Sequence, residues 1–178
     1  MKETIRYAFI LGLICFLSSS VLAVVNGITE PKIKIQKEKE ESRALKEALP
    51  ESSSFKPVFQ EDKIIYYTAY DSDEKLNGFV IKSQGKGYSA NIELLAGLKL
   101  NLEIVNVRIL SQNETPGLGN RIAEPPFLEQ FKGKNLDSFS QVQAITGATV
   151  SSGAVINALK NRISELKEKL LVEVSYAR

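Results

Sequence analysis

Near its N-terminus this chain holds an apolar run, residues 7–25, that contains no charged side chain. As a helix rising ~1.5 Å per residue, the run would span roughly 28 Å, close to the ~30 Å hydrocarbon thickness of a bilayer. A cleaved signal peptide is the alternative, because Lys2 and Arg6 form a basic start and Val21-Leu22-Ala23 resembles a cleavage site. The run exceeds the ~7–15 apolar residues usual in signal peptides, which favours a retained transmembrane helix.

The basic residues around this run give a first indication of its orientation. Lys2 and Arg6 precede it, whereas a larger group follows: Lys32, Lys34, Lys37, Lys39 and Arg43. A count of Lys and Arg therefore places the rest of the chain on the cytoplasmic side.

Changes in composition divide the chain into three parts. Residues 29–54 are polar and rich in Lys and Glu, have a helical pattern that ends at Pro50, and close on Ser52-Ser53-Ser54. We expect a transmembrane anchor over residues 1–28, a polar helical stalk or linker over 29–54, and a globular domain over 55–178. With 43% hydrophobic residues, the chain can form an ordinary core for one such domain.

Missing residue types exclude several kinds of chemistry. The chain has no His, no Trp and a single cysteine, Cys15, inside the apolar run. Iron–sulfur clusters, c-type haem and catalytic zinc all need more Cys or His, so we expect no metal site. Ser–His and Cys–His nucleophile pairs are excluded for the same reason. The net charge of +2, without a basic stripe, gives no sign of nucleic-acid binding.

The globular part has the pattern of a sheet followed by helices. Four segments are rich in β-branched and aromatic residues or alternate in polarity, namely 64–70, 78–82, 92–96 and 103–110, with a break at Gly85-Lys86-Gly87-Tyr88. A short helix is predicted over 124–131. A long amphipathic helix follows, with Val155, Leu159, Ile163, Leu166 and Leu170 on one face. We predict an α+β fold, an antiparallel sheet packed against helices and preceded by the transmembrane helix.

Two polar motifs are candidates for a binding site. Thr146-Gly147-Ala148-Thr149 lies where a loop becomes the long helix, and small side chains there allow a phosphate to approach helix N–H groups. The hydroxyls of Thr146, Ser151 and Ser152 could donate further hydrogen bonds. Ordinary loops and helix caps use the same residue types, so the motif alone decides nothing.

The second motif, Glu114-Thr115-Pro116-Gly117-Leu118-Gly119, follows the last predicted strand. Pro116 and Gly117 suit the central positions of a type II turn, which we expect to expose Glu114 and Thr115. Such turns are common without any function. Gly117 and Gly119 also lack the third glycine of a dinucleotide-binding fingerprint.

Together with a third motif, Gly85-Lys86-Gly87-Tyr88, and in this order and spacing, the two motifs resemble the FMN-binding domain of the G subunit of the Rnf electron-transport complex, and of its relative, the C subunit of the sodium-pumping NADH:quinone oxidoreductase. The resemblance runs from about Tyr66 to Leu159. It implies FMN bound covalently, through a phosphoester, to Thr149. It also implies cofactor contacts from Glu114, Thr115, Gly117 and Leu118, and from the residues around Thr149: Thr146, Gly147, Ala148, Ser151 and Ser152.

The resemblance also implies partners and location. Thr hydroxyls are weak nucleophiles and no His is present, so self-attachment is not expected, and Glu114 and Asp137 are the nearby acids that could assist it. The resemblance implies a separate magnesium-dependent flavin transferase that uses FAD as donor. The flavin would relay single electrons among the other membrane and redox subunits of a complex that links ferredoxin, NAD and Na⁺ or H⁺ transport. The domain would be extracytoplasmic, against the charge count. Alternatives are a membrane-anchored structural or ligand-binding module without covalent flavin, or a flavin reductase acting alone.

Overall fold

The structure is a computed structural model that describes residues 2–61 and 63–176. It divides into two compact units, residues 1–40 and 41–178, which are described separately. Helix α1, Lys2–Ala48, forms the first unit and contributes its last turns to the second. Within the described residues, α1 is the one helix long and apolar enough to cross a membrane, a criterion that a signal sequence also meets.

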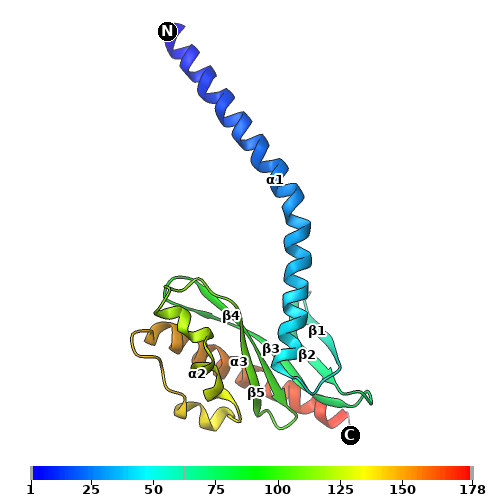
Figure 1. Ribbon diagram of the computed structural model, residues 1–178. Coiled ribbons are helices and arrows are strands. Elements are labelled where there is room, and N and C mark those ends of the chain that lie inside the picture. The colour runs from blue at the N-terminus through cyan, green and yellow to red at the C-terminus, as the bar shows by residue number, and fades with distance from the viewer. Residues whose placement is uncertain (1, 62, 177–178) are drawn as a thin grey trace. The chain divides into compact units, whose positions relative to one another are not determined.

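The second unit is built on a five-stranded antiparallel sheet in which each strand pairs with the one before it (Figure 1). The strands are β1 (Ser54–Gln60), β2 (Lys63–Tyr70), β3 (Leu76–Lys86), β4 (Asn91–Lys99) and β5 (Ile104–Ser111). The predicted α+β class with an antiparallel sheet is confirmed.

The sequence prediction missed strand β1. Its side chains are mostly exposed and it contains Pro57, which a sheet tolerates at an edge. It therefore lacks the alternation that identified the other strands. The predicted break at Gly85-Lys86 was also wrong, because both residues continue β3 and the reversal occurs at residues 87–90.

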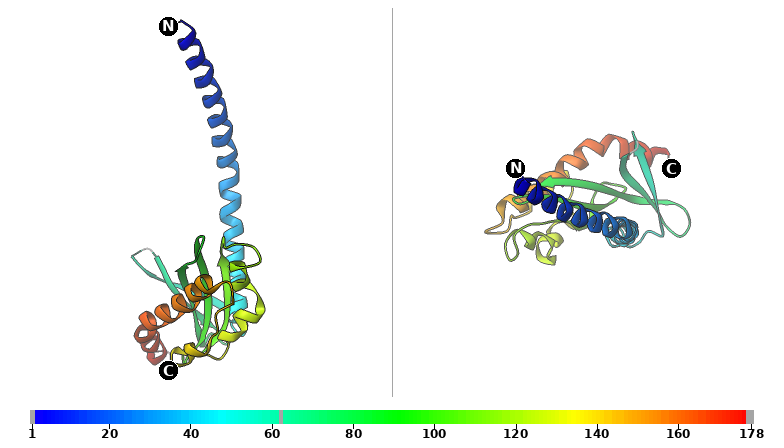
Figure 2. Two further views of the ribbon diagram at one scale, coloured as in Figure 1. Left: turned by 90° about the vertical axis from the view of Figure 1, so that its left-hand side faces the viewer. Right: turned by 90° about the horizontal axis from the view of Figure 1, so that it is seen from above.

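Helices cover both faces of the sheet (Figures 1 and 2). Because successive strand residues point to opposite faces, Phe79 and Ile81 pack beneath α3 (Thr149–Tyr176), whereas Val80 packs beneath the last turns of α1. On the α1 side, the core consists of Ala44, Leu45, Ala48, Leu49, Tyr67, Ala69, Val80 and Leu95. Burial of each large apolar side chain stabilises the fold by about 1.5–3 kcal/mol.

The predicted amphipathic helix is confirmed as α3. All five residues of its predicted apolar face are buried. The predicted short helix is present as α2 (Pro125–Leu128), which continues as the 3-10 turn η2 (Glu129–Phe131). Two further 3-10 helices, η1 (Gly119–Ala123) and η3 (Leu136–Gln141), complete the connection from β5 to α3.

Arg162 links α3 to the sheet by hydrogen bonds at the point where the pairing of β2 with β3 ends. The pairing of β2 with β3 ends at Tyr66 and Ile81. Just beyond, Arg162 Nη2 donates to Ile65 O at 2.8 Å and its Nε donates to Lys82 O at 3.2 Å. These bonds satisfy one carbonyl from each diverging strand and fix how α3 lies across β3.

Candidate functional site

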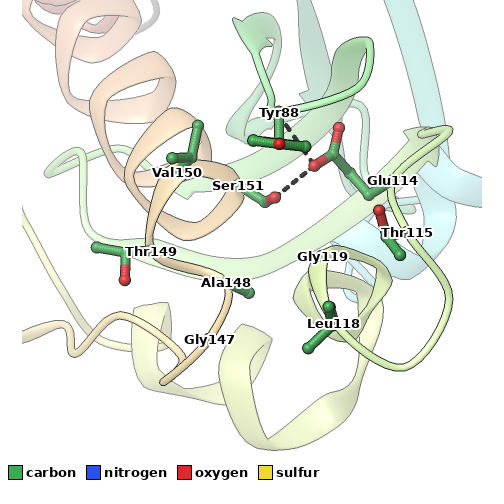
Figure 3. A pocket seen from close by; sticks show the side chains of 10 residues that line it. All are labelled: Tyr88, Glu114, Thr115, Leu118, Gly119, Gly147, Ala148, Thr149, Val150 and Ser151. Atoms are coloured by element: carbon green, nitrogen blue, oxygen red, sulfur yellow. Dashed lines mark hydrogen bonds between the residues drawn. The ribbon is translucent and has the colours of Figure 1, made fainter.

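A pocket of about 380 Å³ lies where α3 begins, and three segments distant in sequence line it (Figure 3). The turn between β3 and β4 contributes Tyr88, the segment after β5 contributes Glu114 to Gly119, and the start of α3 contributes Gly147 to Ser151. Its volume falls within the ~300–1,000 Å³ usual for small-molecule sites. The three motifs of the sequence analysis thus meet at one place.

The loop that enters α3 is a tight turn fixed by Ser152. Ala148 N donates to Ile145 O at 2.9 Å, and Gly147 at the third position has a φ of +82°, as a type II turn requires. Ser152 Oγ accepts from Ile145 N at 3.0 Å and donates to Ala148 O at 2.8 Å. The turn is therefore tied to the first turn of the helix.

The Pro-Gly motif forms the predicted type II turn. Leu118 N donates to Thr115 O at 3.2 Å, and Gly117 has a φ of +75°. The turn meets the one before α3, since a β-carbon added at Gly147 would lie 3.6 Å from Leu118 Cδ2. The two turns together form the lower wall of the pocket in Figure 3.

Glu114 is buried, with 5% of its surface exposed, so the expectation that this turn exposes it was wrong. Thr115 is exposed, as expected. The Glu114 carboxylate accepts hydrogen bonds from three successive amides, Tyr88 N at 3.1 Å, Ser89 N at 3.0 Å and Ala90 N at 3.2 Å. Ser151 Oγ donates a fourth. Successive backbone N–H groups in a turn form a concave site for an anion, which explains how this charge is buried.

These bonds favour the ionised form of Glu114. Burial by itself raises the pKa of the carboxyl, but the hydrogen bonds from Ser151 and from the amides of Ser89, Ala90 and Tyr88 outweigh it and lower the pKa below its ordinary value. Glu114 is therefore ionised at neutral pH. Space around it is tight, since a β-carbon at Gly119 would lie 2.8 Å from both Glu114 Cβ and Ser151 Oγ.

Thr149 is the first residue of α3 and is exposed. The hydrogen bond from Ser152 N to Ala148 O, at 2.9 Å, is of the i to i−4 type. The amides of Thr149, Val150 and Ser151 come before it, so helix geometry gives them no acceptor within α3. An anionic group next to Thr149 would meet these N–H groups and the positive end of the helix dipole, which favour it by about 0.3–1 kcal/mol.

The structure brings most of the predicted site residues together. Glu114, Thr115, Leu118, Gly147, Ala148, Thr149 and Ser151 line the pocket. Three others do not: Thr146 lines a neighbouring cleft beside α2, Gly117 lies outside the lining at the exposed turn, and Ser152 is buried beneath the loop.

Three lining residues were absent from the predicted site: Tyr88, Gly119 and Val150. Two of them leave large apolar surfaces at the pocket, with Tyr88 77% and Val150 55% exposed. Gly119 and Tyr88 belong to the motifs already singled out. Val150 could have been found as an apolar residue in the first turn of α3 that does not belong to its core-facing series.

Comparison with known proteins agrees with this geometry. Residues 87–164 match a model of the FMN-binding domain, and residues 1–48 match a model of the RnfG N-terminal region. Over 176 residues the chain is 30% identical to the G subunit of the ion-translocating oxidoreductase complex of Methanosarcina acetivorans, covering 91% of this chain and 94% of the relative. The chain belongs to the RnfG family. All ten lining residues fall inside the segment that matches the FMN-binding domain.

Other similarities support the assignment to the RnfG family and the fold. The G subunit of the proton-translocating ferredoxin:NAD(+) oxidoreductase complex of Clostridium ljungdahlii is 28% identical over 165 residues, with 88% of each chain covered. The crystal structure of Shewanella oneidensis NqrC superposes with a TM-score of 0.52 at 20% identity, covering 69% of this chain and 73% of NqrC. The C subunit of a Na(+)-translocating NADH-quinone reductase from Parabacteroides distasonis gives 0.51 at 24% identity, covering 59% and 61%. The RnfG-family chain therefore shares the fold of these proteins.

Proposed function

We propose that this chain is the electron-relay subunit of a membrane-bound Rnf-type ferredoxin:NAD⁺ oxidoreductase coupled to Na⁺ or H⁺ transport, and that it carries FMN joined through its phosphate to Thr149 Oγ1. One observation carries the proposal. An exposed threonine, Thr149, begins α3 and lines a pocket built from three motifs, and all the lining residues fall within the segment that matches the FMN-binding domain.

The surroundings of Thr149 suit a phosphodiester. Such a group keeps one negative charge, and the amides at the start of α3 without an acceptor in the helix can donate to it. Exposed apolar surfaces of Tyr88, Leu118 and Val150 lie around the same pocket and suit a flat ring system such as isoalloxazine. When bound, FMN supplies the electron-transfer chemistry, and the protein's part is to hold it.

Attachment requires a separate enzyme. The four hydrogen bonds of Glu114 occupy its carboxylate, and Asp137 is outside the pocket lining, so neither acid is available as a base for the Thr149 hydroxyl. A magnesium-dependent flavin transferase with FAD as donor fits this arrangement. Thr149 Oγ1 would form the new bond to phosphorus, AMP would leave, and the hydroxyl proton would be released.

The proposed assembly follows from the named relatives. The other membrane and redox subunits of the complex are the expected partners, and no soluble substrate is expected. We propose residues 1–28 as a single-pass anchor, residues 29–54 as a stalk or linker whose helical end, around Ala44 to Leu49, packs on the sheet, and residues 55–178 as an extracytoplasmic FMN-binding domain.

Covalent attachment is tested by fluorescence after denaturation. The chain is produced with its transferase, separated on a denaturing gel and viewed under ultraviolet light. We expect a fluorescent band for the wild type and for Thr146→Val, and none for Thr149→Val. A dark wild-type band, with the transferase active on another acceptor, would favour a module without covalent flavin.

A further inference from the structure

Glu114 joins two walls of the pocket that belong to different parts of the chain. On one side its carboxylate binds the amides of the turn that carries Tyr88, and on the other it accepts from Ser151, two residues after Thr149 (Figure 3). The turn after β5, which supplies Leu118, begins at the next residue, Thr115. One side chain therefore contacts every segment that lines the pocket.

The carboxylate has no capacity left for a ligand. A carboxylate offers about four lone-pair sites. Oε1 accepts from Ser89 N and Ala90 N, and Oε2 accepts from Tyr88 N and Ser151 Oγ. An oxygen with both sites filled can neither take a proton from Thr149 nor accept a hydrogen bond from a cofactor. Any effect of Glu114 on the site must pass through the groups that it holds.

Those groups determine the shape of the pocket. The turn at residues 87–90 contributes Tyr88, which is 77% exposed and is therefore not held by packing. Without the carboxylate, three turn amides and the buried Ser151 hydroxyl would lose their acceptor. Such donors must then bind water, either in the space that the side chain leaves or after the turn moves away from α3.

From this arrangement we infer that Glu114 is the positioning residue of the flavin site: its carboxylate sets the distance between the Tyr88 turn and the first turn of α3, and so places Tyr88 and Thr149 for the incoming flavin. This inference rests on the proposed function. It assigns Glu114 a role through Tyr88 and Ser151, distinct from the direct cofactor contact that the family resemblance implies.

Replacement of Glu114 by glutamine should remove only some of its hydrogen bonds. In Glu114→Gln, the remaining carbonyl oxygen can still accept from Ser89 N and Ala90 N, and Ser151 Oγ can rotate to accept from the new amide. Tyr88 N would lose its acceptor, because its N–H group would then face the N–H group of the new amide. Glu114→Gln should therefore retain part of the positioning, and Glu114→Ala should retain none.

The first measurement uses the full-length protein without flavin. We expect hydrogen exchange at the amides of residues 88–90 to accelerate at least tenfold in Glu114→Ala and less in Glu114→Gln, with β4 unchanged. Glu129→Ala and Glu129→Gln, the same changes at an exposed residue, should leave it unchanged. Unchanged exchange at residues 88–90 in Glu114→Ala would overturn the inference.

The second measurement follows the initial rate at which purified transferase adds FMN to each folded variant. We expect a fall of tenfold or more for Glu114→Ala, an intermediate rate for Glu114→Gln, and wild-type rates for the Glu129 variants. If Glu114→Ala does not fold, Glu114→Gln and Ser151→Ala carry the test. Some Glu114 variants could show faster hydrogen exchange at residues 88–90 and yet add FMN at the wild-type rate, with wild-type flavin fluorescence. That result would show that Glu114 only stabilises the fold, and it would overturn the inference. A wild type that accepts no FMN would instead refute the proposed function.

Discussion

Ser151 Oγ donates a hydrogen bond to Glu114 Oε2 across 37 residues of sequence. The bond links the first turn of α3 to the turn that follows β5. Both residues are buried, at 2% and 5% exposure, although one chain neighbour of each, Val150 for Ser151 and Thr115 for Glu114, is exposed. A polar contact beneath the surface thus fixes two exposed segments of the pocket wall.

The lowered pKa of Glu114 predicts a loss of stability in acid. A carboxyl whose pKa is lower in the folded state stabilises the fold above its unfolded pKa of ~4.3. That stability is lost as the pH falls from ~4.3 through the folded pKa. We expect thermal unfolding scans between pH 7 and pH 3 to show a smaller fall in Tm for Glu114→Gln than for the wild type. Parallel curves would contradict an ionised, hydrogen-bonded Glu114.

Ser152→Ala should destabilise the second unit. The hydroxyl accepts from Ile145 N and donates to Ala148 O, and it is completely buried. Its removal leaves the Ile145 amide without that acceptor, at a cost of about 1–3 kcal/mol. Chemical denaturation provides the measurement. Ser175→Ala, which removes an exposed hydroxyl of the same helix, should change stability by no more than ~0.5 kcal/mol.

Two glycines near the site should respond to alanine in opposite directions. Gly147 has a φ of +82°, where a β-carbon costs about 1–2 kcal/mol, so Gly147→Ala should be destabilising. Gly153 lies within α3, and a β-carbon there would have no neighbour within 4 Å. Gly153→Ala should stabilise by about 0.4–1 kcal/mol. Equal shifts in Tm for the two variants would contradict the described turn.

The sequence predicted α3 and four strands because their apolar residues recur at regular spacing and face one core. It could not predict the burial of Glu114. Its partners are mostly backbone N–H groups, which any sequence could supply, and a charged residue beside a Pro-Gly turn is usually exposed. Strand β1 was missed because an exposed edge strand carries little hydrophobic pattern. The place of Tyr88 in the pocket could not be predicted either, because it depends on the β3–β4 turn lying next to the start of α3, which is distant in sequence.

Membrane topology can be measured directly, and the two sequence arguments about it disagree. Basic residues after the apolar run favour a cytoplasmic domain, whereas the family resemblance implies an extracytoplasmic one. We expect an alkaline phosphatase fused to the C-terminus to be active in cells. An inactive fusion at normal expression, together with an active cytoplasmic reporter at the same position, would show that the charge count is correct.

The central claim is that Thr149 carries the flavin, and peptide mass spectrometry tests it most directly. Trypsin releases residues 135–160 as one peptide, because no Lys or Arg lies between Lys134 and Lys160. From cells that contain the transferase, we expect this peptide to gain the mass of FMN less one water, with fragment ions placing the addition on Thr149. Thr149→Ser should keep the addition and Thr149→Val should lose it. FMN located on another residue, or still covalently bound in Thr149→Val, would contradict the account.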